Sequence, residues 1–385
     1  MKRVIFFCYG DSSKPSTWSN VPYCFTKALI DIGYDIIRID ISPNRYVNRI
    51  FNILISNPLR LLFPNSTYCY IRSRVFKYRV DNIIKKAIIK NNENQKIDLC
   101  IFSCFDFYNS VNNIPTILLS DWTYEILIKE RLKRNPYKFE RCFIKQQSQA
   151  INKADLVISL FPACAESMKM KFPHANIHYL GSNVVNVIYK KEAISKEIIH
   201  RKIASKSIIF IGGKQYTNGA LKLIKAIEII NKGRNGDSRV NLNIIGLKDK
   251  DIKIKRDFVH CHGYLNKDIE TENELYYKLL LEACIFVNPT PIWGGYSSTV
   301  EAMYFYTPII ISPYKDFVKE FGPDIEFGRY NESFNEKCIA ENILSIINMQ
   351  NTDYNIICEK AHNAVKNYTW DVYITKMLNL INNKI

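Results

Sequence analysis

The chain has 385 residues, of which 47% are hydrophobic, and it carries a formal net charge of +16. At roughly 150 residues per domain, this length predicts two domains, and the apolar content excludes a disordered chain. No stretch reaches the ~18 uninterrupted apolar residues of a membrane-spanning helix, so the chain is not expected to cross a membrane.

The cysteines are scattered singly, without the paired spacing of a zinc site or the density of a small secreted scaffold. We therefore expect a reducing, cytoplasmic location. The first apolar run, RVIFFC, is short and predicts a buried strand rather than a targeting segment.

The first half alternates short apolar runs with helical patterns. Strands are expected at 3–10, 34–41, 97–105, 115–121 and 154–161, and helices at 19–33, 80–91 and 163–172, with a long basic helical region around 129–145. Nearly continuous apolar strands that alternate with helices are typical of a parallel sheet covered on both faces.

The second half repeats this plan. Strands are expected at 206–213, 240–246, 258–264, 284–290 and 308–312, and helices at 219–233, 272–283 and 297–306. The prediction is an α/β protein with two doubly wound, Rossmann-like domains that face a central cleft, where ligands would lie beyond the carboxyl ends of the strands.

The positive charge is concentrated in two segments. Residues 45–90 contain ten Lys or Arg and one acid, Asp81, with several aromatic residues among them, and 129–145 is a second basic stretch. This pattern favours an anionic partner, and the candidates are a phospholipid surface, a phosphorylated acceptor and nucleic acid. The alternative is a solvated basic face.

A glycine pair precedes a helical pattern in the stretch WGGYSSTVEAMYFYTPIII, residues 293–311. Ser297 or Ser298 is expected to cap the helix, whose N-terminus would favour a phosphate. Gly294 and Gly295 would let the backbone approach a ligand, and Glu301 could accept from sugar hydroxyls. A plain strand-turn-helix connection is the alternative reading.

Three segments together resemble glycosyltransferases with the B-type two-domain fold, above all the large family-four group. They are FIGGKQYTNGALKLIKAI (210–227), VNPTPIWGGYSSTVEAMYFYTPIIIS (287–312) and YTWDVYITKMLNLI (368–381). The resemblance implies an acceptor-binding domain over 1–185, a nucleotide-sugar-binding domain over 186–365, and a final helix, 366–385, that crosses back to the first domain.

The chain departs from the family pattern at several positions. Trp293 stands where the first acid of a paired-carboxylate element is usual, and Gly213 and Asn218 replace the Arg and Lys of the phosphate turn. Lys214 is the nearby cation, and Tyr306 replaces a glycine that ends the helix. The stretch 293–302 is also similar to the nucleotide-sugar signature of inverting B-fold enzymes, so stereochemistry stays open.

The resemblance implies a set of site residues. Catalytic candidates are Asp121, which we prefer as the residue next to the sugar, Asp11 and Lys214; a simple loop-turn role is the alternative for both acids. The expected donor-binding residues are Gly10, Gly213, Lys214, Tyr264, Leu265, Trp293, Gly294, Gly295, Tyr296, Ser297, Ser298, Thr299 and Glu301.

We expect no metal and no cofactor other than the nucleotide-diphosphate sugar, because a cation and a helix dipole can stabilise the leaving group. His260 and His262 alternate on an expected strand, and two histidines without further ligands rarely bind a metal.

The expected function is transfer of a sugar to a cell-envelope glycan or lipid-linked saccharide, with retention favoured. The basic 45–90 region would contact the acceptor or an anionic membrane surface, whereas nucleic acid is not the expected partner. A non-hydrolysing sugar-nucleotide epimerase, or a catalytically silent glycan- or nucleic-acid-binding protein of the same fold, are the alternatives.

Overall fold

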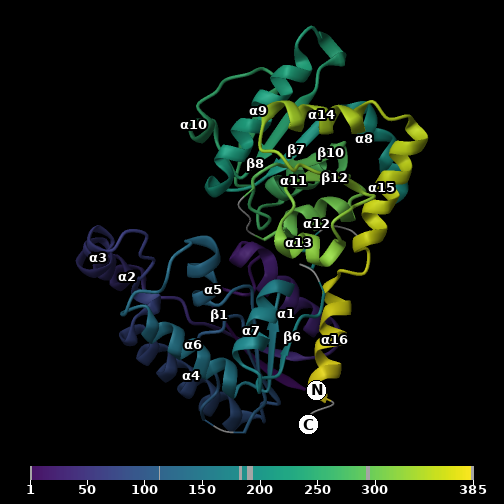
Figure 1. Ribbon diagram of the computed structural model, residues 1–385. Coiled ribbons are helices and arrows are strands. Elements are labelled where there is room, and N and C mark those ends of the chain that lie inside the picture. Colours follow the sequence, from purple (N-terminus) through teal and green to yellow (C-terminus); the bar gives the residue numbers. More distant parts are fainter. Residues whose placement is uncertain (1, 112, 182–183, 189–193, 292–294, 383–385) are drawn as a thin grey trace. The chain divides into compact units, whose positions relative to one another are not determined.

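The computed structural model describes residues 2–111, 113–181, 184–188, 194–291 and 295–382. The chain divides into two compact units: unit 1 is Met1–Ser182 with Trp370–Ile385, and unit 2 is Asn183–Thr369. Each unit contains one parallel six-stranded sheet flanked by helices (Figure 1). The predicted α/β class, with a doubly wound sheet in each half, is confirmed.

The sheet of unit 1 has the strand order β2-β1-β3-β4-β5-β6. Its strands are β1 (Arg3–Cys8), β2 (Asp35–Asp40), β3 (Leu99–Phe102), β4 (Thr116–Ser120), β5 (Leu156–Ser159) and β6 (Ile177–His178). Residues 4–8 of β1 are all buried because helices cover both faces of the sheet.

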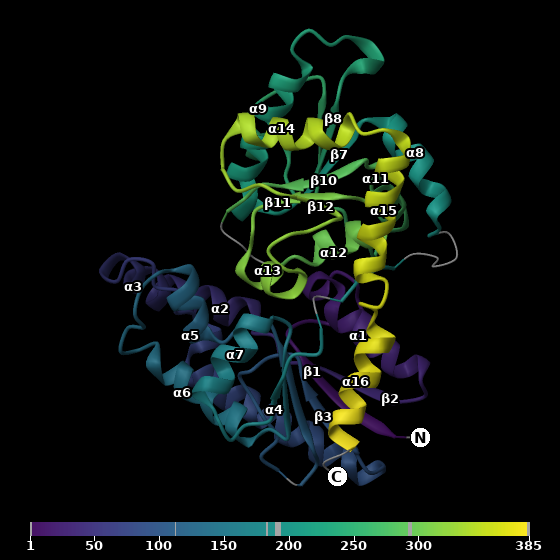
Figure 2. The same cartoon turned by 45° about the vertical axis from the view of Figure 1, so that its right-hand side comes forward.

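The helices of unit 1 include one from the far end of the chain. They are α1 (Val21–Asp31), α2 (Arg45–Phe51), α3 (Asn57–Leu62), α4 (Arg74–Asn94), α5 (Tyr124–Ile126), α6 (Arg141–Lys153), α7 (Pro162–Lys171) and α16 (Trp370–Asn382). Figure 2 shows α16 beside α1, where Trp370 meets Phe25 edge to face at 5.6 Å between ring centroids.

The sheet of unit 2 has the order β12-β11-β10-β7-β8-β9. Its strands are β7 (Ser207–Ile211), β8 (Asn241–Ile245), β9 (Val259–Gly263), β10 (Ile285–Asn288), β11 (Ile309–Ile311) and β12 (Gly328–Tyr330). Its helices are α8 (Ile199–Ser205), α9 (Thr217–Asn231), α10 (Asp249–Ile252), α11 (Glu270–Glu282), α12 (Ser297–Tyr304), α13 (Lys315–Phe321), α14 (Glu336–Ile347) and α15 (Asn351–Val365).

The helix expected over 129–145 is not formed as one element. A π-helical turn (Leu127–Arg131) ends α5, and α6 begins only at Arg141. Between them Lys133 is left-handed (φ 51°), and the Arg134 guanidinium turns inward onto the fully buried Glu140, with N–O distances of 2.7 and 2.8 Å. Pro136 prevents one continuous helix here, and this bidentate ion pair holds the turn.

No helix among the described residues is long and apolar enough to span a membrane.

Unit 2 contains a buried lysine that should make stability depend on pH. The Lys202 ammonium donates to the carbonyls of Leu280 (2.7 Å) and Ala283 (3.1 Å) and to the Thr307 hydroxyl (2.9 Å). Burial lowers its pKa to about 7 from 10.5. Between these values Lys202 binds more protons in the unfolded chain, so its contribution to the free energy of unfolding should rise with pH, by up to about 1.4 kcal/mol per unit.

Denaturant unfolding between pH 7 and pH 8.5 measures this slope as the difference between the wild-type protein and Lys202→Met, because cysteine ionisation contributes equally to both. Lys202→Met should remove the Lys202 contribution, whereas Lys232→Met, at an exposed site, should keep it. Equal slopes in the wild-type protein and Lys202→Met would contradict the assignment.

Candidate functional site

The topology of unit 2 marks a ligand-binding edge. β7 lies between β10 and β8 in the sheet. After β7 the chain passes through α9 to β8 on one side, and after β10 it continues to β11 on the other side. The connections after β7 and β10 therefore diverge at the carboxyl ends of neighbouring parallel strands. In open α/β sheets, this switch point is where ligands bind.

The connection after β7 presents backbone with little side chain. Gly212 and Gly213 precede Lys214, and Gly246, after β8, has a φ of +101°. A Cβ on Gly246 would lie 2.5 Å from the Gly212 carbonyl oxygen. The two strand ends can approach this closely only because residue 246 is glycine.

Lys214 extends from this glycine-lined loop. Its side chain is 78% exposed, and its ammonium lies 3.4 Å from Asp251 Oδ1. A hydrogen bond from the Lys248 amide, followed by Lys214 itself, holds the pKa of the Asp251 carboxyl below its usual value. Lys214 thus offers a cation that a bound anion can recruit.

The start of α9 touches the connection after β10. A Cβ on Gly219 would lie 2.1 Å from Thr290 Oγ1 and 3.2 Å from Thr290 Cβ. Thr290 is itself held by a 2.7 Å hydrogen bond from its hydroxyl to Asn288 Oδ1. Gly219 therefore brings the two connections at the switch point into direct contact.

Gly219→Ala should destabilise the protein. Alanine in a helix ordinarily stabilises by about 0.5–1 kcal/mol relative to glycine, but the collision with Thr290 should instead cost about 1–3 kcal/mol. Thermal unfolding of Gly219→Ala, Thr290→Ala and the double variant measures the coupling. The double variant should recover part of the loss, and a gain in stability for Gly219→Ala alone would refute the contact.

The start of α12 is not capped by a serine side chain. The helix begins at Ser297, so that Ser297 and Ser298 lie in its first turn, and the N-cap residue is Tyr296, whose side chain makes no capping hydrogen bond. The predicted serine cap is therefore wrong. The amide groups of Ser297, Ser298 and Thr299 have no acceptor within the helix, as at any helix start, and can bind an anion.

The glycine pair is described only in part. Gly295 is exposed, directly before the start of α12, while Trp293 and Gly294 lie outside the described residues. The predicted backbone approach at Gly295 stays a prediction.

Glu301 is buried on α12 with both carboxylate oxygens engaged. Oε1 accepts from the Lys267 ammonium and Oε2 from the Tyr276 hydroxyl, each at 2.7 Å. The Lys267 ammonium also lies 3.9 Å from the Tyr276 ring centroid and 5.0 Å from that of Tyr277. Glu301 can contact ribose only through its remaining lone pairs, and Lys267 and Tyr276 fix the direction in which these point.

The connection after β9 carries Tyr264 and Leu265. Tyr264 is 62% exposed and Leu265 is 8% exposed, so Leu265 could meet a ligand mainly through its backbone. On β9 itself, the His262 ring pairs with Asn243 Oδ1 at 2.9 Å. Among the described residues, no group of three or more His, Cys, Asp or Glu is placed to bind a metal ion.

Tyr306 adopts the backbone conformation that normally requires glycine, with a φ of 57°. Its ring stacks on His362 at 4.1 Å between centroids and 3° between planes. The stacking contact offsets the strain of about 1 kcal/mol expected for a side chain in this region.

Unit 1 has a corresponding switch point between β1 and β3, which are neighbours although β1 leads to β2. Gly10 follows β1 with a φ of +100°, and Asp40 Oδ1 accepts from its amide at 2.9 Å. Asp11 is exposed, and its Oδ1 accepts from the amide and hydroxyl of Ser13 at 2.9 and 2.6 Å, which lowers its pKa. These bonds favour the turn role for Asp11.

The chain after Asp11 is strained. Trp18, Ser19 and Asn20 have successive positive φ values of 39°, 53° and 67°. Each such residue costs on the order of 1–3 kcal/mol, and such conformations concentrate at ligand-binding loops.

Asp106 was not predicted and lies at this switch point, after β3. It is buried, with Oδ2 accepting from the Tyr9 hydroxyl and Oδ1 from Gln147 Nε2, both at 2.7 Å. Burial raises its pKa, despite these bonds. The only sequence signal for it was its position directly beyond the apolar run 97–105.

Asp121 follows β4, the next strand of the same sheet. Its Oδ1 accepts from the Trp122 amide at 2.8 Å and from the Ser120 hydroxyl at 3.3 Å. Burial raises the pKa of the Asp121 carboxyl. A raised pKa makes it easier for a carboxyl to take up a proton.

Solved structures with both domains match this architecture. Sucrose-phosphate synthase from Thermosynechococcus elongatus superposes with a TM-score of 0.65 at 12% identity, over 100% of this chain and 99% of that one. TarM gives 0.63 at 15% identity over 99% of each chain. The chain has the B-type glycosyltransferase fold.

A glycosyltransferase from Rickettsia africae gives 0.63 at 13% identity, over 99% of this chain and 98% of that one. A variant of TarM from S. aureus, solved with UDP, alpha-GlcNAc-glycerol and Fondaparinux, gives 0.55 at 21% identity, over 77% of this chain and 58% of that one. No protein-family model and no curated protein sequence matches the chain. The resemblance to B-type-fold glycosyltransferases is confirmed at the level of fold, and membership of the family-four group stays a prediction.

Proposed function

We propose that this protein is a glycosyltransferase that takes a sugar from a nucleotide-diphosphate donor. The observation that carries the proposal is the pair of connections at the β7/β10 switch point of unit 2. One supplies Lys214 on a glycine-lined loop, and the other supplies the start of α12 without a side-chain cap from Tyr296. Both features suit a diphosphate.

In this proposal the donor diphosphate binds the amides of Ser297, Ser298 and Thr299 together with the Lys214 ammonium. The same groups stabilise the charge that develops on the leaving nucleotide, so the reaction proceeds without a metal ion. Glu301 accepts hydrogen bonds from the ribose hydroxyls, and the nucleobase of the donor lies along the backbone of Tyr264 and Leu265.

Asp121 is the proposed residue on the sugar side, because its raised pKa separates it from Asp11, whose pKa is lowered. Asp106, after the neighbouring strand β3, also has a raised pKa and accepts a hydrogen bond from Tyr9. Retention remains the favoured stereochemistry, on the resemblance to the family-four group.

The proposed acceptor is a cell-envelope glycan or a lipid-linked saccharide that binds the basic unit 1. The complex of a TarM variant with alpha-GlcNAc-glycerol and UDP supports this pairing of donor and acceptor classes. The proposed location is cytoplasmic, at the membrane surface.

A thermal-shift panel of nucleotide sugars tests the proposal. A true donor should raise the free energy of unfolding by about 2.7 kcal/mol at a hundredfold excess over Kd. Release of the nucleoside diphosphate should follow on addition of an acceptor. Salt-sensitive binding to DNA, with no stabilisation by any nucleotide sugar, would instead support a catalytically silent descendant.

A further inference from the structure

Residues 45–62 form one helical rod on unit 1. α2 continues through a π-helical turn (Asn52–Ser56) into α3, and the residues at both junctions, Asn52 and Asn57, have right-handed helical φ/ψ values. Asn44 caps the start by accepting from the Tyr46 amide at 2.9 Å. We call this element the 45–62 helix; α2 and α3 lie at the periphery of unit 1 in Figures 1 and 2.

The polarity of the 45–62 helix is inverted. Asn48, Asn52 and Ser56, at helical spacing, lie on the less exposed face together with Phe51 and Leu59; Ser56 is fully buried and donates to Asn52 Oδ1 at 3.0 Å. The exposed face instead carries large apolar side chains, which are Tyr46 (79% exposed), Val47, Ile50, Ile53, Leu54 (68%), Ile55, Leu61 (86%) and Leu62.

A surface helix of a water-soluble protein places its polar residues outward. The 45–62 helix does the reverse, so its outer face is suited to an apolar environment rather than to water. An exposed apolar patch of this kind marks an interaction site.

The helix is a fixed platform because aromatic contacts hold its middle and its C-terminal end. The Phe51 ring packs on Tyr68 and Tyr70 at 6.1 and 5.4 Å between centroids. The Phe63 ring packs on Tyr137 and Phe139 at 5.1 and 5.2 Å. These aromatic residues of the basic region therefore support the helix from within and leave its aliphatic side chains outside.

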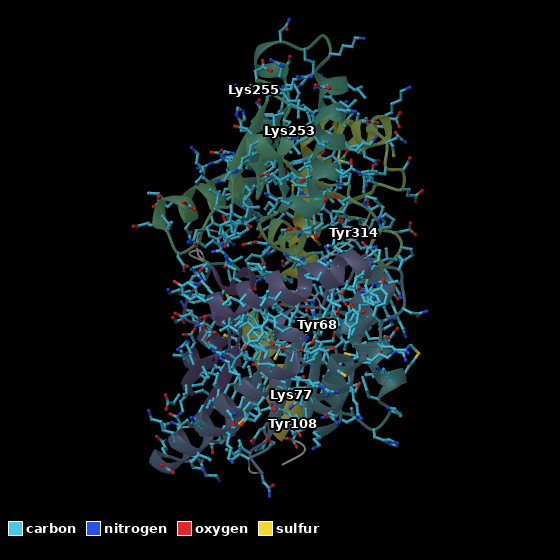
Figure 3. All side chains as sticks on the ribbon, turned by 90° about the vertical axis from the view of Figure 1, so that its left-hand side faces the viewer. Tyr68, Lys77, Tyr108, Lys253, Lys255 and Tyr314 are labelled. Carbon is cyan, nitrogen blue, oxygen red and sulfur yellow. The ribbon has the colours of Figure 1, made fainter. Side chains whose placement is uncertain are left out.

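The charge around the apolar face selects the kind of partner. Arg45, Arg49 and Arg60 are exposed on the helix, which contains no acid, and residues 45–90 hold ten Lys or Arg against Asp81 alone. The side of unit 1 that carries α2 and α3 faces the viewer in Figure 3, where Tyr68 and Lys77 are labelled. Pairing with a second copy would bring two such basic surfaces together, on chains of net charge +16.

We propose that the 45–62 helix docks this protein on the surface of an anionic phospholipid bilayer. The apolar side chains of Ile50, Leu54 and Leu61 enter the boundary between headgroups and acyl chains, while the arginines contact lipid phosphates. This inference is independent of the reaction proposed above, since it uses none of the residues placed in the donor site.

Co-sedimentation with vesicles tests the docking. The full-length protein should bind vesicles containing phosphatidylglycerol far more strongly than vesicles of phosphatidylcholine alone, and binding should weaken as salt is raised. Ile50→Ser/Leu54→Ser/Leu61→Ser should reduce partitioning by about a hundredfold or more. Arg45→Gln/Arg49→Gln/Arg60→Gln should reduce it by about a hundredfold on anionic vesicles.

The matched control changes exposed apolar residues on other helices. Met170→Ser/Ile229→Ser/Ile356→Ser, on α7, α9 and α15, should bind vesicles as the wild-type protein does. All variants should melt as the wild type does, because the substituted side chains are exposed. Undiminished binding by the variant with serine at 50, 54 and 61, or no binding by the wild type, would overturn the proposal. So would a dimer in solution that this variant abolishes while vesicle binding is absent.

Discussion

Lys214→Ala should reduce turnover of the nucleotide sugar by about a hundredfold or more, the scale seen when one preorganised donor to a developing negative charge is removed. Lys214 is the cation on the glycine-lined loop after β7, and its exposed side chain packs against little else. The loss should therefore appear in kcat and in donor affinity without a change in thermal stability. Steady-state kinetics and calorimetric titration with the donor found in the thermal-shift panel measure both.

Lys232→Ala, at the opposite end of α9, is the matched control and should behave as the wild type. Lys214→Arg keeps the charge and should retain most of the activity. If Lys214→Ala binds the donor and hydrolyses it as well as the wild type does, the diphosphate does not lie at this loop, and the proposed donor site fails with it.

Glu301→Leu should lower the free energy of unfolding by about 3–5 kcal/mol, because it leaves the buried Lys267 ammonium without its counter-ion. Lys267 and Glu301 are 8% and 5% exposed, so solvent cannot replace the lost partner. Denaturant unfolding measures the loss. Asp257→Leu, which breaks an exposed pair with Arg239, should have little effect.

The double variant Glu301→Leu/Lys267→Met separates the two roles of Glu301. Removal of both charges should recover most of the stability. If Glu301 also accepts ribose hydroxyls, donor affinity should stay about tenfold or more below that of the wild type. Wild-type donor affinity in the stable double variant would leave Glu301 with a structural role only.

Strands buried on both faces were the most predictable part of the fold. The short, nearly continuous apolar runs that contain β1, β7 and β10 are typical of strands in a parallel sheet that is covered on both faces. β6 and β12 were missed because two or three residues at a sheet edge carry no periodicity. The break between α5 and α6 was missed although Pro136 marks it in the sequence. The ion pair of Arg134 with Glu140 that holds this turn exists only in the folded chain.

The parts of the candidate site that could be predicted are those where the backbone conformation requires a particular residue type, above all glycine. The glycines near 213 and 295 pointed to the connections after β7 and β10, and Tyr306 to a left-handed backbone. Asp106, Gly219 and the Lys267–Glu301 pair depend on contacts between segments far apart in the sequence. Spacing along one chain does not encode such contacts.

For the basic region, residues 45–90, the sequence did not predict which side chains are exposed. Its composition, a mixture of cations and aromatic residues, indicated an anionic partner but not which side chains would face that partner. In the structure Tyr70 and Phe76 are buried, whereas the aliphatic residues of the 45–62 helix are exposed. Helical periodicity identifies the apolar face of a segment, but it does not say whether that face packs against the rest of the protein or is left exposed for a partner.

The absence of space between Gly219 and Thr290 has a consequence for the time course of a catalytic cycle. The start of α9 and the connection after β10 are packed without a gap, so we expect the two walls of the proposed diphosphate site to move together. We therefore expect a spent nucleotide to leave without separation of these walls. If its release needs only rotamer changes of single side chains such as Lys214, which take picoseconds to nanoseconds, the slow step of turnover should lie outside this pair of loops.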